Sequence, residues 1–190
     1  MAIVLASQSP RRQELLARIG VEDFKTLSLD IDESYPEGLS PEDTVRYIAK
    51  KKCDAAAALC SPDDLIITAD TMVFLGNDRL GKPRDEDDAF RMLRELVGRA
   101  HTVCTGVSVR RGAQEERFAV STRVFFRPMT DDEIRAYIKT GEPMDKAGAY
   151  GVQSRGALFV ERIDGDFFNV MGLPVEQLGL VLARFGVKLL

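Results

Sequence analysis

Histidine and cysteine are both scarce in this sequence, and their scarcity limits its chemistry. There is one histidine, His101, so a His-rich zinc site is excluded and a Ser-His-Asp triad could use only this residue. The three cysteines, Cys53, Cys60 and Cys104, form no Cys-x-x-Cys pair. An odd and scattered set of cysteines is typical of a reducing compartment rather than of a disulfide framework.

Long apolar runs and a large charge excess are also missing. No apolar run approaches the roughly 18 residues that a helix needs to cross a bilayer. Residues 1–5 are not followed by the long apolar stretch of a signal peptide, and no basic segment precedes one. The net charge of −4 argues against broad binding to nucleic acid or to a membrane surface. We therefore expect a soluble, cytoplasmic protein with neither nucleic acid nor a membrane as its partner.

Three common motifs are absent as well. No Gly-x-x-x-x-Gly-Lys-Ser/Thr loop is present, which argues against a P-loop ATPase. No Gly-x-Gly-x-x-Gly follows a strand, which argues against a Rossmann dehydrogenase, and no Gly-x-Ser-x-Gly nucleophile elbow occurs.

The residues that are present alternate between apolar strands and capped helices. The 190 residues, 45% of them hydrophobic, suffice for a single domain over residues 1–190, built of one body or of two lobes without a linker. Strands are predicted at residues 2–6, 24–29, 65–69, 101–110, 115–126 and 158–163, with residues 72–75 continuing the third strand or pairing with it. Helices are predicted at residues 9–20, 40–59, 85–97, 130–141 and 174–186, and a glycine-rich loop at residues 146–154. Because one hairpin accompanies units that look parallel, the pattern predicts an α/β fold with a mixed sheet.

A cluster of serines and arginines lies at the start of the first predicted helix. Ser7 and Ser9 precede Arg11 and Arg12 there, although the helix dipole favours acidic side chains at this end. Hydroxyls, guanidinium groups and backbone N–H groups could converge on a phosphate at this point. The alternative is that both arginines point into water, and spacing alone does not separate the two interpretations.

Acidic residues follow two of the predicted strands. Asp70 comes directly after the apolar run 65–69, at the predicted carboxyl end of a strand, where α/β sheets bind ligands. Asp32 and Glu33 follow the strand at residues 24–29. A carboxylate in such a place can hold a metal or activate water, whereas the alternative is a turn-forming Asp that caps a backbone amide.

Three lysines have unusual surroundings. Lys52 follows Val45 by seven residues on the apolar stripe of its helix, so it must snorkel outward, pair with an acid or face a polar cleft. Lys82 lies between Gly81 and Pro83, and Lys146 precedes the glycine-rich loop, although loop lysines are usually solvated. Clustered acids and cations together indicate phosphate-ester or phosphoanhydride chemistry. His101, on an alternating strand, is predicted to be structural.

These residues fall in blocks that resemble a known family in order and over nearly the whole chain. The blocks are residues 7–16, 31–33, 49–52, 69–71, 81–83, 105–107, 141–153 and 169–174. They closely resemble the motifs of the Maf family of nucleoside triphosphate pyrophosphatases. Two departures stand out: Cys53 occupies a position where alanine is common, and Ser154 and Arg155 replace a position often held by glycine.

The resemblance implies a metal-dependent hydrolase that cleaves a nucleoside triphosphate to its monophosphate and pyrophosphate. The implied fold is two-lobed α/β with a central cleft, similar to that of the inosine triphosphate pyrophosphatases. Asp70 matches the proton acceptor of the family. The matching cleft residues are Ser7, Arg11, Arg12, Glu33, Lys52 and Lys82.

The resemblance also bears on specificity. The chain is similar to the subgroup that prefers dTTP and UTP at Arg12, Thr71 and Gln153. The sister subgroup, which acts on 7-methyl-GTP, has Gln after the catalytic Asp and Ser-Glu near the position of Gln153, and this sequence has neither. Canonical and modified pyrimidine nucleotides both remain open as substrates.

The expected mechanism joins the two lines of reasoning. Glu33 and Asp70 are expected to hold Mg²⁺ or Mn²⁺, while Asp70 also deprotonates the attacking water. The cationic side chains would stabilise charge on the phosphate oxygens, and the Gln153 amide could read a base edge. The alternatives are 7-methyl-GTP as substrate, or a nucleotide-binding regulator of septum formation. The expected partner is the nucleotide, with a homodimer left open.

Overall fold

The computed structural model describes residues 1–190, and the chain divides into two compact units. The first unit comprises Met1–Asp70, Thr105–Val120 and Gly172–Leu190, and the second comprises Thr71–Cys104 and Ser121–Met171. Three long strands contribute residues to both units: β3 (Leu65–Leu75), β5 (Ala100–Arg111) and β6 (Gln114–Phe126). The seven-stranded sheet has the order β2-β1-β3-β5-β6-β7, with β4 paired to β3.

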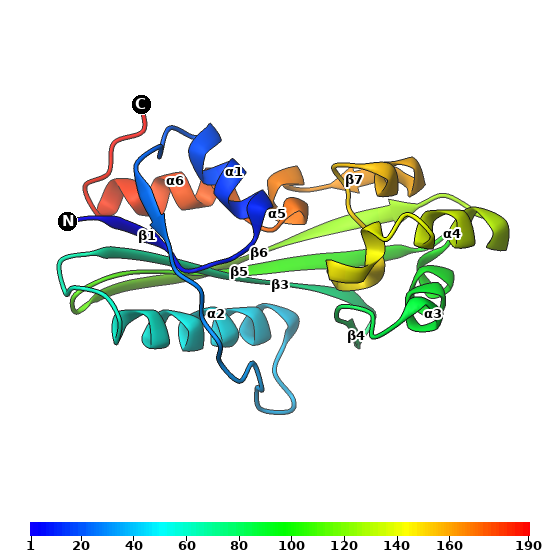
Figure 1. The fold of residues 1–190 in the computed structure, drawn as a ribbon, viewed down its shortest axis with the longest axis horizontal. Helices are drawn as coiled ribbons and strands as arrows, with labels where there is room; N and C mark the ends of the chain where they lie inside the picture. Colours follow the sequence, from blue (N-terminus) through cyan, green and yellow to red (C-terminus); the bar gives the residue numbers. More distant parts are fainter. The chain divides into compact units, whose positions relative to one another are not determined.

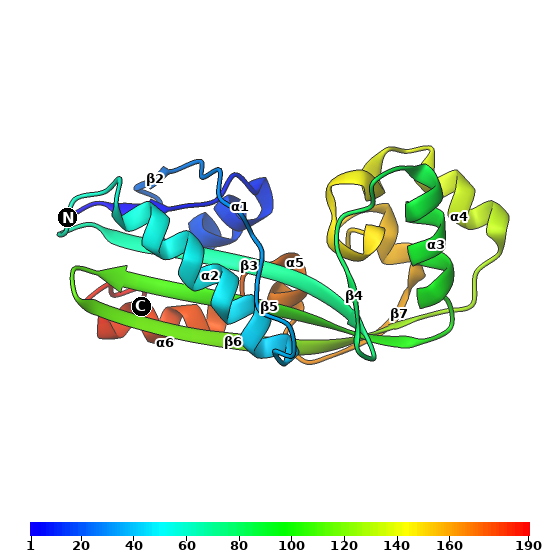
Figure 2. The ribbon, with the colours of Figure 1, turned by 90° about the horizontal axis from the view of Figure 1, so that it is seen from below.

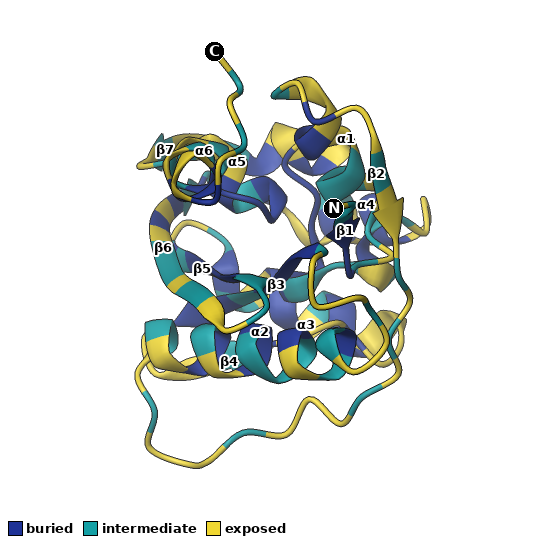
Figure 3. Cartoon of the chain, turned by 90° about the vertical axis from the view of Figure 1, so that its left-hand side faces the viewer, coloured by how far each residue is buried: buried dark blue, intermediate teal, exposed yellow.

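The first unit has helices on both faces of its part of the sheet. β1 (Ile3–Leu5) pairs in parallel with β2 (Phe24–Thr26) and with β3. Helix α2 (Pro41–Ala57) covers one face, and α1 (Pro10–Arg18) and α6 (Val175–Arg184) cover the other (Figure 1). The side of α2 that faces the sheet is buried and its outer side is exposed (Figure 3).

Sequence features explain why α2 begins and packs where it does. The Ser40 hydroxyl accepts a hydrogen bond of 3.1 Å from the Asp43 N–H and so caps the helix. The apolar residues at helical spacing within α2, from Val45 to Ala56, are fully buried, whereas Leu59 lies beyond the end of the helix and is exposed. Gly106 on β5 lets the helix approach closely, because a Cβ at this position would lie 2.3 Å from the Val45 carbonyl carbon.

The second unit is built mainly from short elements around the remaining strand segments. It contains α3 (Glu86–Leu96), α4 (Asp131–Ile138), α5 (Phe167–Met171), β4 (Asp78–Leu80), β7 (Val160–Asp164) and 3-10 helices at Glu142–Asp145, Ala147–Ala149 and Arg155–Phe159. Helices α3 and α4 lie side by side (Figure 2). Asp85 caps α3, and Thr130 with Glu133 forms a complete capping box on α4.

The predicted mixed α/β architecture is confirmed: β1 pairs in parallel with its neighbours, whereas β3–β4 and β6–β7 are antiparallel. Of the two alternatives for residues 72–75, continuation of the strand is correct, and β4 then pairs back onto β3 after the turn at Gly76. The predicted strand 24–29 is shorter, ending at Thr26, and the predicted loop 146–154 contains a 3-10 helix. No helix has both the length and the apolar character needed to cross a membrane.

Candidate active site

Asp70 lies in the middle of β3 rather than at the end of a strand. The expected strand end after residue 69 is wrong, because β3 continues to Leu75. The parallel partner does end here, since the β1 register stops at Leu5 opposite Ile67 and the Ala6 N–H donates to the Ile67 carbonyl at 2.9 Å. Asp70 therefore lies just beyond the carboxyl end of β1, where its strand has lost one neighbour, and only 6% of the residue is exposed.

Lys52 joins the two candidate carboxylates. Its Nζ lies 2.8 Å from Asp70 Oδ1 and 2.8 Å from Glu33 Oε1. Its side chain is 14% exposed and that of Asp70 is 8% exposed, whereas half of the Glu33 side chain reaches solvent. Of the three alternatives for Lys52, pairing with acids is therefore correct, because an ammonium group on this buried stripe needs a counter-charge.

Helix α2 is fixed to β3 at the point that brings Lys52 to Asp70. The Thr68 hydroxyl donates a buried hydrogen bond of 2.7 Å to the Ala49 carbonyl. Lys52 comes one helical turn after Ala49, and Asp70 comes two residues after Thr68 on the same side of the strand. The two charged side chains therefore meet beside this buried contact.

The second carboxylate oxygen of Asp70 has no hydrogen-bond partner. Oδ2 is buried and accepts no hydrogen bond from the chain, while Oδ1 is engaged by Lys52. Buried polar oxygens are nearly always satisfied, so an exception of this kind points to a water or an ion as the partner. Oδ2 is the atom of this site that is available for chemistry.

Arg12 and Ser7 border the same carboxylate. Arg12 donates to the Gly172 carbonyl at 2.8 Å, to the Ala69 carbonyl at 2.9 Å and to the Ser7 hydroxyl at 3.3 Å. Burial lowers the pKa of Arg12, the charges of Asp70 and Glu33 oppose that shift, and Arg11 adds to it. For Arg12, the alternative of a side chain pointing into water is therefore wrong.

The amino terminus of α1 adds positive potential here. No side chain caps it, Pro10 takes the first helical position, and its first turn has no acidic residue. Arg11 and Arg12 occupy that turn instead, in a place where the helix dipole favours an anion. The negative charge of phosphate oxygens is complementary to the positive charge of these residues.

The remaining predicted site residues belong to the second unit. Thr71 follows Asp70 on β3, Lys82 is exposed on the loop before α3, and Gln153 is exposed directly after the buried Val152. Lys146 donates to the Glu142 carbonyl at 2.8 Å and to the Asp145 carboxylate at 2.6 Å, so it is held within its own loop. The roles of Thr71, Lys82 and Gln153, and the predicted central cleft, stay predictions.

His101 is structural in its contacts, as predicted. It is 2% exposed, its Nε2 lies 2.8 Å from the Tyr150 hydroxyl, and its ring packs edge-on against Phe126. Burial lowers the pKa of His101 to about 4. These contacts hold a neutral imidazole in place, which matches the predicted structural role.

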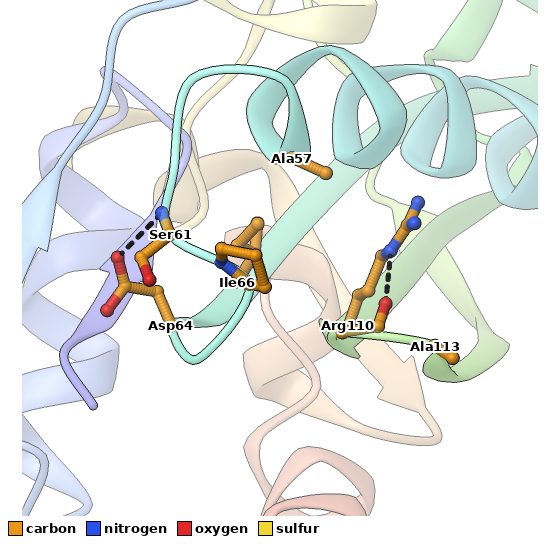
Figure 4. Close-up of a pocket in the computed structure, with 8 residues that line it drawn as sticks. Ala57, Ser61, Asp64, Ile66, Arg110 and Ala113 are labelled. Carbon is orange, nitrogen blue, oxygen red and sulfur yellow. Dashed lines mark hydrogen bonds between the residues drawn. The ribbon is translucent and has the colours of Figure 1, made fainter.

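A separate pocket lies in the first unit, away from these residues. It has a volume of about 330 Å³ and is lined by residues from the end of α2, the start of β3 and the turn between β5 and β6 (Figure 4). Its charged groups are engaged: Asp64 accepts from the N–H groups of Ala2 and Ser61, and Arg110 donates to the Gly112 carbonyl. None of the predicted site residues lines it, so the chemistry points to the surroundings of Asp70.

Sequence reasoning missed the groups that hold Arg12 and the Gln153 segment. Arg12 donates to the backbone carbonyls of Ala69 and Gly172, and residue type does not indicate which carbonyl accepts such a hydrogen bond. Tyr137 and Glu142, which bind the backbone on both sides of Gln153, were not expected either. The only available signal was the position of Glu142 within the motif block 141–153.

The chain resembles proteins whose names agree with this chemistry. The family model described as "Maf-like protein" matches residues 2–185. A dTTP/UTP pyrophosphatase of Bacillus velezensis is 46% identical over 186 residues, which cover 98% of this chain and 97% of that protein. One from Dictyoglomus turgidum is 47% identical over 191 residues, covering 99% and 98%.

A solved structure shows the same fold at low identity. A HAM1 protein from Coxiella burnetii matches with a TM-score of 0.56 and 14% identity, over 97% of this chain and 99% of that chain. At this identity the likeness concerns the architecture alone.

Proposed function

The chain belongs to the Maf family, and from this premise we propose that it hydrolyses dTTP and UTP to the monophosphate and pyrophosphate. The observation that carries the proposal is Asp70, a buried carboxylate with one oxygen held by Lys52 and the other without a hydrogen-bond partner. The names of the relatives at 46% and 47% identity support the substrate.

We propose a divalent cation, Mg²⁺ or Mn²⁺, as cofactor. The residues fit such an ion, because the Glu33 and Asp70 carboxylates are hard oxygen donors brought together by Lys52, and they could hold the ion directly or through water. No group of three acidic, histidine or cysteine side chains could hold a metal by itself. Mg²⁺ commonly binds through one or two carboxylates together with substrate phosphates, which matches this sparse donor set. When bound, the cation would supply positive charge to the phosphate oxygens.

In the proposed reaction, Asp70 takes a proton from the attacking water at Oδ2. The water oxygen forms a bond to phosphorus while the anhydride bond between the α and β phosphates breaks, and pyrophosphate leaves. Lys52 fixes Oδ1 and thereby orients the carboxylate. Arg11, Arg12, Ser7 and the amino terminus of α1 would stabilise the negative charge that grows on the phosphate oxygens.

We propose that the second unit supplies base recognition through Gln153 and Thr71 and a further cation through Lys82. The Gln153 amide has both a donor and an acceptor, so it can pair with the edge of a pyrimidine. Specificity for 7-methyl-GTP is the alternative, and the relatives named dTTP/UTP pyrophosphatase favour the pyrimidines. A pure regulator of septum formation has no need of a water-activating acid, which favours catalysis over that role.

A nucleotide panel tests the proposal. Release of pyrophosphate from dTTP, UTP, CTP, GTP and 7-methyl-GTP would be measured with Mg²⁺, with Mn²⁺ and with excess chelator. We expect dTTP and UTP to have the highest kcat/KM, and we expect chelator to abolish the reaction. Release of orthophosphate would contradict the reaction class, a preference for 7-methyl-GTP would contradict the substrate, and an unchanged rate in chelator would contradict the metal.

We also propose that the protein works in the cytoplasm. Cys53, Cys60 and Cys104 form no disulfide bond, which is typical of a reducing compartment. A homodimer stays a prediction, which analytical ultracentrifugation would test.

A further inference from the structure

Gln153 is exposed, and the backbone on either side of it is held by hydrogen bonds to Tyr137 and Glu142. We propose that these two are positioning residues, which fix the Gln153 segment and so set the preference for dTTP and UTP over CTP. The inference rests on the proposed function, because it assumes that Gln153 reads the base.

Hydrogen bonds hold the backbone on each side of Gln153. The Tyr137 hydroxyl accepts from the Gly151 N–H at 3.1 Å and donates to Glu142 Oε1 at 2.8 Å. The same Oε1 accepts from the Gly156 N–H at 3.2 Å, and Oε2 accepts from the Arg155 N–H at 3.3 Å. One tyrosine and one glutamate therefore close a small loop around the residues between Gly151 and Arg155.

The backbone of this loop leaves no room for a side chain at either of its two glycines. A Cβ on Gly156 would lie 2.5 Å from the Gly151 carbonyl oxygen, and a Cβ on Gly151 would lie 2.7 Å from Lys146 Cε. Gly151, Val152 and Gly156 are buried, whereas Gln153 is exposed. The base of the loop is thus fixed within the protein while the amide at its tip remains accessible to a ligand.

The charge of Glu142 suits this arrangement. Burial opposes ionisation of Glu142, but hydrogen bonds from Ser154, Tyr137, Gly156 and Arg155 outweigh it and lower the pKa of the carboxyl. Burial also raises the pKa of Tyr137, so its hydroxyl keeps the proton that it donates to Glu142. Lys146 is directed to the Glu142 carbonyl instead of the carboxylate, which leaves the carboxylate to the loop.

Because two residues of this segment are glycines, its backbone needs the hydrogen bonds to Tyr137 and Glu142 to keep one conformation. Gly151 and Gly156 give the backbone more conformations in the absence of tertiary contacts than other residues would. A side chain that must meet a base edge has to be held to within about 0.5 Å, and this precision comes from residues behind it. Tyr137 itself is anchored on α4, where its ring packs edge-on against Phe159 at 4.7 Å.

The test compares variants of the two positioning residues with a tyrosine variant that loses a buried hydroxyl elsewhere in the second unit. Tyr137→Phe removes the two hydrogen bonds that the hydroxyl makes with Gly151 and Glu142. Glu142→Gln removes the negative charge and keeps the shape of the side chain. Tyr150→Phe is the matched control, because its hydroxyl binds His101 instead of the loop. For each variant, kcat and KM for dTTP and CTP, the Tm and the amide hydrogen exchange of residues 151–156 would be measured, with Gln153→Ala as the reference for loss of base reading.

We expect Tyr137→Phe and Glu142→Gln to lower the preference for dTTP over CTP by about tenfold, chiefly through a higher KM for dTTP. Exchange at residues 151–156 should accelerate in both variants and not in Tyr150→Phe, even where the Tm values fall equally. If Gln153→Ala loses the preference while Tyr137→Phe and Glu142→Gln keep it, the inference is overturned and the proposed function stands. If Gln153→Ala keeps the preference, the base-reading role fails first, and the positioning role fails with it.

Discussion

Replacement of Lys52 should lower both stability and activity, whereas replacement of an ordinary surface lysine affects neither. Its ammonium group lies among buried side chains, and removing it leaves Asp70 buried without its partner. We expect Lys52→Ala to lower kcat/KM for dTTP by at least about 10²-fold and to lower the free energy of unfolding by about 1–3 kcal/mol. Turnover and urea denaturation would measure the two effects.

Lys50 provides the matched control for this change. It lies on the same helix and pairs with Asp54 on the exposed side, so Lys50→Ala should leave both quantities nearly unchanged. In an Asp70→Asn background, Lys52→Ala should cost less stability than it does alone, because the carboxylate charge that it leaves behind is gone. A normal rate in Lys52→Ala would show that the Lys52–Asp70 pair serves the fold alone.

Asp70 is the residue on which the proposed chemistry depends most. Asp70→Asn keeps the shape of the side chain but cannot accept a proton, so turnover should fall by about 10² to 10⁴ or more. Stability should change little, because Lys52 keeps Glu33 as a counter-charge. Asp54→Asn, which also removes an ion-paired carboxylate in the first unit, should retain full activity. A variant with more than about a tenth of the wild-type rate would contradict the role of Asp70 as base.

At the level of residues, the sequence predicts which charged side chains are candidates for chemistry better than it predicts what holds them. Charge at unusual positions made Arg12, Lys52 and Asp70 candidates, and the structure brings them together. Two of the hydrogen bonds that hold Arg12 end on backbone carbonyls, which every residue type offers alike. The unpartnered Oδ2 of Asp70 depends on where β1 ends, and that follows from strand pairing rather than from local pattern.

Replacement by alanine should have opposite effects on stability at two glycines of the first unit, because one lies in a crowded strand and the other in a helix with room for a methyl group. Gly106 on β5 faces α2, where a Cβ would lie 2.3–2.6 Å from backbone atoms of Val45 and Arg46. Gly179 lies inside α6, where a Cβ would make an ordinary contact of 3.6 Å with Leu189. We expect Gly106→Ala to lower the unfolding free energy by about 1–3 kcal/mol and Gly179→Ala to raise it by about 0.5–1 kcal/mol. Urea denaturation of both variants measures this, and a stable Gly106→Ala would show that α2 can move away from β5 at little cost.

Caps and periodicity predict the helices well, whereas strand length depends on partners. Ser40, Asp85 and Thr130 each cap the helix that their position predicts. β3 runs through Asp70, although a charged residue in an apolar run suggests a boundary, because pairing with neighbouring strands continues beyond it. Helix α5 is only five residues long, little more than one helical turn, which is too short for apolar positions to repeat.

For the whole molecule, the alternation of strands and helices was sufficient to predict the mixed α/β class. The likeness to a HAM1 protein at 14% identity shows that this architecture tolerates extensive change of sequence. The division into two units is harder to predict, because its boundaries fall inside β3, β5 and β6, where the strand pattern continues without a linker. The alternation of apolar residues predicts each strand as a whole, but it does not predict the residue at which the strand passes from one unit to the other.

The single histidine gives the whole molecule a pH dependence that can be assigned to one residue. Burial lowers the pKa of His101 to about 4 in the folded state, against about 6.5 in an unfolded chain. The unfolded state therefore binds more protons between these values, so His101 contributes stability that is fully present above about pH 6.5 and is lost as the pH falls toward 4. Between about pH 8 and pH 5 the loss should be about 2 kcal/mol, measured as the urea dependence of unfolding at each pH. His101→Gln keeps a neutral partner for Tyr150 but does not titrate, so it should lose less stability over this range than the wild type; the remaining loss comes from carboxyls whose pKa is lowered in the folded state, such as Glu133. Because no other histidine exists, an equal pH dependence in wild type and His101→Gln would show that His101 is protonated in the folded protein as readily as in the unfolded chain.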